Sequence, residues 1–202
     1  MKYIKLCGAL ILLLLANCAM LQIQSFIDEP IDADSIKLPI QISSLSIIDY
    51  RRNVDNRDIN ISWFALPGDK DEVLPKLSSD QRQLINDEFM KYVVNKSDNY
   101  TVRTVIEIVE GSKNYKCSWF FEDMKARSTI RITLYDSFHT PYLISATGEA
   151  VSTYTSGVST KKYMEGLYQK AIRMALYKAV ESISKNNEIF SAPESESRPS
   201  KI

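Results

Sequence analysis

The chain has 202 residues, of which 45% are hydrophobic. This is enough for one domain with a real core and too little for two ordinary domains. Lys plus Arg and Asp plus Glu each number 25, so the formal net charge is zero. Because nucleic-acid binding requires a basic surface, this balance argues against a nucleic acid as the partner.

The N-terminus has the pattern of a secretory leader. A short basic stretch at residues 1–5 precedes an apolar stretch at residues 6–16, which is too short to span a membrane as a helix. The sequence Leu15-Ala16-Asn17-Cys18 follows and resembles a bacterial lipobox, in which the cysteine thiol receives diacylglycerol before cleavage. Asn17 departs from that pattern, since Gly, Ala or Ser usually stands there. The resemblance implies that residues 1–17 are a signal peptide and that Cys18 is the lipid-attachment residue.

Two alternatives to lipidation stay open. In one, the leader is not cleaved and remains as an anchor; in the other, an ordinary signal peptide is removed and Cys18 is there by chance. If Cys18 is acylated, the membrane is its partner, because two or three acyl chains hold a protein stably on a bilayer. In enterobacterial-type sorting an Asp after the cysteine favours the inner membrane. Ala19 therefore implies the outer membrane, with the domain facing the periplasm, and inner-membrane anchoring is the alternative.

Composition divides the rest of the chain into three segments. Residues 18–37 carry several acidic residues without regular periodicity, which predicts a flexible linker after the lipidated cysteine. Residues 38–186 hold the periodic patterns of a folded domain. Residues 187–202 have the Ser, Glu and Pro bias of a disordered tail. Once the leader is removed and Cys18 is acylated, Cys117 is the remaining thiol, so no internal disulfide is expected.

Hydrophobic periodicity predicts strands and two helices in the domain. Strands are expected at residues 39–50, 59–66, 100–110, 115–123, 127–136 and 142–154. Residues 111–114 are expected to form a hairpin turn, and Gly148 to weaken or bulge the last strand. Ser78 and Gln81 form the pattern of a capping box, which predicts a helix beginning at Ser79. A longer amphipathic helix is expected at residues 160–185.

These elements predict an α+β domain. A mostly antiparallel sheet of four to five strands, with both helices packed on one face, buries every apolar stripe in a two-layer sandwich.

Few residues in the chain suggest catalysis. His139 is the one histidine and lies in a predicted turn, so a histidine-based metal cluster is excluded. Cys117 alternates with Tyr115, Trp119 and Phe121, which predicts a core thiol rather than a nucleophile. The chain has 6 glycines and lacks a Gly-rich phosphate loop.

Three carboxylates are candidates for catalysis. Asp123, Asp136 and Glu149 are interpreted as solvated charges, because a glycosidase needs two carboxylates at a defined separation. We therefore expect no enzyme activity, no catalytic residue, no metal and no cofactor.

Two segments are candidate binding surfaces. The sheet face away from the helices is expected to present alternating polar and aromatic side chains from two strands. They are Arg103, Val105 and Glu107 beside Thr129, Arg131, Thr133 and Tyr135, with Phe120 as a further candidate. Such a face docks a partner or lipid, or is simply the solvated side of an antiparallel sheet. Residues 62–67 contain Trp63 and Phe64, and belong either to a core or edge strand or to a loop that touches a membrane or partner.

The order of these segments resembles that of small Gram-negative envelope lipoproteins. The resemblance rests on the lipobox, residues 47–51 at the end of the first strand, the alternating run 129–136 and the closing helix at residues 168–176. YajG-like lipoproteins, LptE-like lipoproteins and auxiliary lipoproteins of lipid transporters share this order. It implies a non-catalytic binding or assembly module that supports lipid or lipopolysaccharide transport or membrane-protein assembly, with an envelope protein or lipid as partner. The alternative is a cell-wall or glycan hydrolase that uses an Asp/Glu pair.

Overall fold

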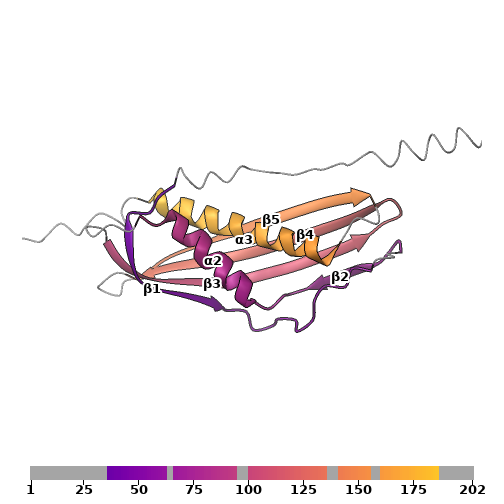
Figure 1. The fold of residues 1–202 in the computed structure, drawn as a ribbon, viewed down its shortest axis with the longest axis horizontal. Coiled ribbons are helices and arrows are strands. Elements are labelled where there is room, and N and C mark those ends of the chain that lie inside the picture. Colours follow the sequence, from indigo (N-terminus) through magenta and orange to yellow (C-terminus); the bar gives the residue numbers. More distant parts are fainter. Residues whose placement is uncertain (1–35, 63–65, 95–99, 136–140, 156–159, 187–202) are drawn as a thin grey trace, which may run out of the picture.

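The computed structural model describes residues 36–62, 66–94, 100–135, 141–155 and 160–186. Cys18, the leader, most of the linker, Trp63, Phe64, Asp136, His139 and the C-terminal tail lie outside these ranges. Two helices, α2 (Ser79–Tyr92) and α3 (Lys161–Ser184), cover one face of a five-stranded sheet, as Figure 1 shows. The predicted α+β class, with a mostly antiparallel sheet and two helices on one face, is confirmed.

The sheet is organised around one long strand, β3 (Tyr100–Cys117). On one side it pairs with β4 (Phe121–Tyr135), which in turn pairs with β5 (Pro141–Thr155), both antiparallel. On its other side the first half of β3 pairs in parallel with β1 (Ile40–Asp49), and the last part pairs antiparallel with the short β2 (Lys70–Val73). The β1–β3 pair is parallel because the chain returns through α2, and a parallel pair needs such a crossover.

The strand predicted at residues 59–66 is wrong. Within the described part of that segment no strand forms, and the short strand lies instead at β2. In this segment backbone amides donate to aspartate carboxylates instead of to a neighbouring strand. The amide of Ile59 donates to Asp58 Oδ1 at 2.8 Å, and the amide of Asn60 donates to Asp71 Oδ2 at 2.7 Å. The apolar Ile59 side chain is buried all the same, which explains why its pattern looked like that of a strand.

The hairpin turn predicted at residues 111–114 is also wrong, because β3 runs through it to Cys117. A bulge between Ile108 and Glu110 inserts one residue into β3. The inward-facing positions therefore change from even numbers, such as Ile106, to odd numbers, such as Lys113. A bulge of this kind interrupts the alternation without ending the strand. By contrast, the bulge predicted at Gly148 is absent from the described β4–β5 pairing, whose register is continuous.

The true hairpin turn has Trp119 and Phe120 at its apex. Ser118 fixes it: its amide and its hydroxyl both donate to the Phe121 carbonyl at 2.8 Å, and its Oγ accepts from the Phe121 amide at 3.1 Å. The segments predicted as separate strands at 115–123 and 127–136 are therefore the end of β3, this turn and β4.

Both helices begin close to the predicted positions, and each has a capping residue. The backbone N–H of Gln81 donates to Ser78 Oγ at 3.2 Å, and the backbone N–H of Ser78 donates to Gln81 Oε1 at 3.1 Å, so the capping box is confirmed. Thr160 caps α3 by accepting from the Tyr163 amide at 3.1 Å. Each cap satisfies helix N–H groups that have no partner within the helix.

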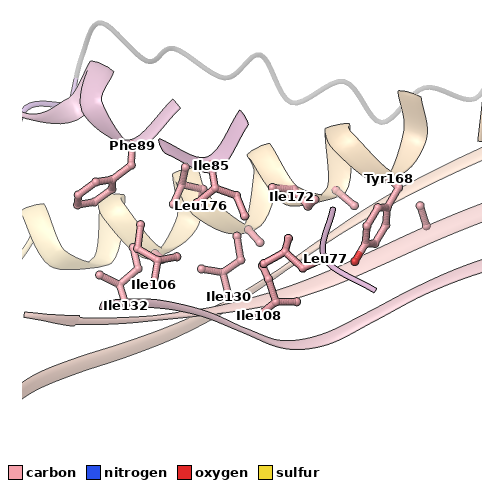
Figure 2. Packing of buried hydrophobic residues seen from close by; sticks show 14 of the residues in the cluster. Leu77, Ile85, Phe89, Ile106, Ile108, Ile130, Ile132, Tyr168, Ile172 and Leu176 are labelled. Atoms are coloured by element: carbon pink, nitrogen blue, oxygen red, sulfur yellow. The ribbon is translucent and has the colours of Figure 1, made fainter. Parts of the chain in front are cut away.

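The core lies between the helices and the inner face of the sheet. Figure 2 shows isoleucines of β3 and β4 beneath side chains of both helices. Those labelled are Ile106, Ile108, Ile130 and Ile132 of the sheet, Ile85 and Phe89 of α2, and Tyr168, Ile172 and Leu176 of α3. Cys117 is a buried free thiol, as predicted. Ile36 is buried as well, so the core includes residues just before the first strand.

Candidate functional site

The carboxylates considered for hydrolysis do not form a pair in the described structure. Glu149 lies opposite Arg127 on β4, four residues along that strand from Asp123. At about 3.3 Å per residue the two are separated by roughly 13 Å along the strand, whereas glycosidase carboxylates lie about 5–10 Å apart. Glu149 also binds Lys125 at 2.9 Å. Their separation makes Asp123 and Glu149 unsuited to act together.

The sheet face away from the helices carries the side chains predicted for it. We call this surface the open face. It comprises Ser44, Ser46 and Ile48 of β1, Arg103, Val105 and Glu107 of β3, Thr129, Arg131, Thr133 and Tyr135 of β4, and Leu143, Ser145 and Thr147 of β5. The exposed apolar residues Ile48 and Leu143 lie on its two sides. Phe120 does not belong to it, because it lies in the hairpin turn.

Arginines on the open face are held against aromatic rings. The guanidinium carbon of Arg103 lies 4.3 Å from the ring centroid of Tyr135, and that of Arg131 lies 4.6 Å from the ring of Tyr50. Arg131 Nε also donates to Glu107 Oε2 at 2.5 Å, and this hydrogen bond raises the pKa of Arg131 above its usual value. An exposed cation–π contact contributes about 0.5–1 kcal/mol. These contacts fix the orientation of both arginines before any partner arrives.

A partly buried ion pair lies beside Tyr168 of α3. Arg51 donates to both carboxylate oxygens of Asp49 at 2.7 Å and to the Pro75 carbonyl at 2.6 Å. Burial tends to raise the pKa of Asp49, but the hydrogen bonds from Arg51 and the Leu77 amide outweigh it and lower that pKa. Burial raises the pKa of the neighbouring Tyr168 hydroxyl. Arg51 and Asp49 bind each other and also bind the backbone at Pro75 and Leu77, so the pair fastens the loop between β1 and α2.

A second buried cation belongs to the same region. Lys113 on β3 binds the Glu165 carboxylate on α3, and Gln81 Nε2 donates to the other oxygen of that carboxylate at 3.0 Å. Hollows of about 450 and 400 Å³ flank Arg51 and Lys113 respectively. Since both cations are engaged by protein carboxylates, we assign Arg51 to holding the loop before α2 and Lys113 to holding β3, α2 and α3 together.

The hairpin turn is a surface that sequence reasoning missed. Trp119 is 80% exposed and Phe120 is 75% exposed, and both differ from the core or open-face positions expected of them. Phe121 and Leu66 are also exposed. The loop of Leu66 lies beside the turn, because Gly68 donates to the Cys117 carbonyl at 3.0 Å and Cys117 donates to the Asp69 carbonyl at 2.7 Å. We call Leu66, Trp119, Phe120 and Phe121 the aromatic tip.

The signal for the aromatic tip was present in the sequence. Three consecutive aromatic residues at positions 119–121 cannot share one face of a strand, and Ser118 before them is a common turn residue.

Two properties concern the described residues alone. Over these ranges no helix has the length and apolarity needed to cross a membrane. Nor do three His, Cys, Asp or Glu side chains gather anywhere in them in a way that could hold a metal ion.

Comparison with known proteins finds structural similarity but no family model and no curated relative. A crystal structure of a minor lipoprotein from Acinetobacter baumannii is similar over 71% of this chain and 94% of that chain, at 13% identity and a TM-score of 0.38. A similarity of this extent gives no basis for assigning function.

Proposed function

We propose that the protein is a bacterial envelope lipoprotein that acts as a non-catalytic binding module. In this proposal residues 1–17 are removed and acylated Cys18 anchors the domain at the periplasmic face of the outer membrane. Two or three acyl chains are sufficient for a stable anchor. The chain from Cys18 to Ile36 spans up to roughly 60 Å when extended, which gives the domain freedom to reach a neighbour.

The open face is the surface we assign to a protein partner, and its arginine–tyrosine pairs carry the proposal. Protein interfaces are enriched in Arg and Tyr, and their strongest contacts come from such side chains held in place beforehand. Arg103 and Arg131 are held in this way by Tyr135 and Tyr50. A sheet face that was merely solvated would not require its arginines to be oriented. The partner we propose is an envelope protein involved in membrane-protein assembly or lipid transport.

The absence of catalysis is part of the proposal. Among the described residues, the lowered carboxylate pKa values belong to Asp49, Asp71 and Asp87. A catalytic acid needs a pKa raised toward the working pH, which is the opposite direction.

Site-specific photo-crosslinking in cells tests the open face. A photoreactive residue replaces Leu143, which is exposed on the open face, and a matched control replaces Gln83, which is exposed on α2. We expect a discrete protein adduct from position 143 and none from position 83. Arg131→Ala should remove that adduct, because it breaks the contacts to Glu107 and Tyr50. Identical adducts from both positions, or none from position 143, would contradict the proposal.

A further inference from the structure

The aromatic tip lies at the opposite end of the domain from the start of the described chain. Leu38 donates its amide to the Tyr92 carbonyl, and Ile40 pairs with Tyr100 at the first residue of β3. The tip follows Cys117, the last residue of the same strand. Seventeen residue steps of about 3.3 Å separate these ends by roughly 56 Å. Figure 1 shows the β3–β4 turn and the entry into β1 at the two ends of the molecule.

The tip is a convex and well-fixed projection. Trp119 and Phe120 extend beyond the last residue pair of the hairpin, Cys117 with Glu122. The hydrogen bonds between Ser118 and Phe121 hold the turn, so the aromatic side chains are exposed by a defined backbone. Exposing large aromatic side chains to water is unfavourable and usually marks a contact surface. A projecting apolar turn of this kind can insert into a deformable lipid layer without a preformed pocket to receive it.

Charged residues at this end favour a negatively charged surface. Lys70 and Lys116 lie directly opposite each other on β2 and β3, next to the turn, and Lys161 and Lys162 begin α3 at the same end of the sheet. The exposed carboxylates there are Asp69 and Asp123, with Glu72 further along β2. The four exposed lysines therefore outnumber the three exposed carboxylates.

An apolar groove lies on the same end of α3. It has a volume of about 420 Å³ and is lined by Tyr163, Gly166 and Leu167, with Lys162 and Lys170 also on its wall. Apolar surface beside lysine ammonium groups matches the two parts of an anionic phospholipid, its acyl chains and its headgroup.

We propose that the aromatic tip inserts into the interfacial region of an anionic phospholipid bilayer. Trp119 places an apolar ring and a polar indole N–H at the same depth, which is the chemistry found where bilayer and water meet. Lys116 and Lys162 interact with the phosphate headgroups. This membrane contact goes beyond the proposed function. If Cys18 is the anchor, its linker joins the end of the domain opposite the tip. The linker spans up to roughly 60 Å and the domain is roughly 56 Å long, so the tip can reach the membrane that holds Cys18.

Quenching of Trp119 fluorescence by brominated lipids tests the proposal. The full chain has two tryptophans, so Trp63→Phe leaves Trp119 as the single reporter. This variant is reconstituted in vesicles of phosphatidylethanolamine and phosphatidylglycerol with brominated acyl chains. The matched control carries its single tryptophan at an exposed position on α2, made by Gln83→Trp with Trp63→Phe and Trp119→Phe.

The expected result is a blue shift and strong quenching of Trp119, with little quenching at position 83. Replacing phosphatidylglycerol with phosphatidylcholine, or introducing Lys116→Glu with Lys162→Glu, should reduce the quenching. Unquenched Trp119, or equal quenching at both positions, overturns the proposal. A discrete protein adduct from a photoreactive residue at position 120 in cells also overturns it, since it identifies a protein partner. None of these outcomes depends on crosslinking at Leu143, so failure here and failure of the proposed function are distinguishable.

Discussion

Substitution of Gly111 by alanine is expected to destabilise the protein through a close contact in the core. A Cβ atom at Gly111 would lie 2.3 Å from Tyr168 Oη and 2.7 Å from Arg51 Nη1. Ordinary contact begins at 3.4 Å, so the tyrosine oxygen would have to move by about 1 Å. Tyr168 is fully buried, as its position in Figure 2 illustrates, and Arg51 is bound to both oxygens of Asp49. Neither side chain can yield easily.

The cost follows from the overpacking that this contact produces. Extra atoms in a packed interior cost roughly 1–3 kcal/mol, and we expect Gly111→Ala to fall in that range. Removal of the tyrosine oxygen should recover part of the loss. The buried Tyr168 hydroxyl lies beside the Arg51 guanidinium but makes no hydrogen bond of ordinary geometry with a described residue, so Tyr168→Phe alone should change the free energy of unfolding little. In the double variant, the two changes should couple by roughly 0.5–1 kcal/mol, with residual strain against Arg51.

Urea unfolding, followed by circular dichroism, measures these free energies. Gly166→Ala is the matched control, because an added Cβ at Gly166 meets nothing within 4 Å and the residue lies within α3. That change should stabilise the protein by roughly 0.5–1 kcal/mol, since glycine is unfavourable inside a helix. A Gly111→Ala variant as stable as the parent chain would contradict the expected clash. So would a Tyr168→Phe background in which the penalty at Gly111 is unchanged.

Three further predictions concern the anchor and the charged contacts. Cys18→Ser should abolish lipidation and release the protein from membranes, so an unchanged intact mass and membrane fraction would refute the anchor. Hydrogen bonds from Arg57 lower the pKa of Asp71 from 3.8 to about 2. Ionised Asp71 therefore stabilises the fold above pH 3.8, and this stabilisation is lost as the pH falls toward 2. In urea unfolding, the midpoint of Asp71→Asn should fall less over this pH range than that of the parent chain. Glu165→Gln should lower the free energy of unfolding, measured in urea, by roughly 1–2 kcal/mol, because it removes the carboxylate nearest to the buried Lys113. This cost is smaller than that of breaking a fully buried pair, because Glu165 is partly exposed.

The features that the sequence predicted correctly are those set by neighbouring residues. Ser78 and Gln81 lie three positions apart, so their capping box and the start of α2 could be predicted from the sequence alone. The composition of the open face could be predicted too, because alternate residues of a strand share one face. The pairing of Arg103 with Tyr135 then follows once β3 and β4 are adjacent and in register.

The errors come from interactions between residues far apart in the chain. The bulge before Glu110 reverses the alternation of β3, and with Gly111 next to it the pattern looked like a turn. What Gly111 provides is space for Tyr168, which is 57 positions away and comes from another element. No local pattern contains that contact. The turn expected at residues 111–114 left Trp119 and Phe120 within a predicted strand, and so concealed the aromatic tip.

The bulge in β3 also brings polar groups into the interior. Before it, β3 turns Ile106 and Ile108 inward; after it, the inward positions include Gly111 and Lys113 as well as the apolar Tyr115 and Cys117. Carboxylates that fasten the loop from β1 to α2, whose β2 strand borders the tip, include Asp49 and Asp71. Both have lowered pKa values, so these contacts persist until the pH falls below the ordinary carboxylate range. A contact made through the aromatic tip should therefore depend on these two carboxylates only below that range.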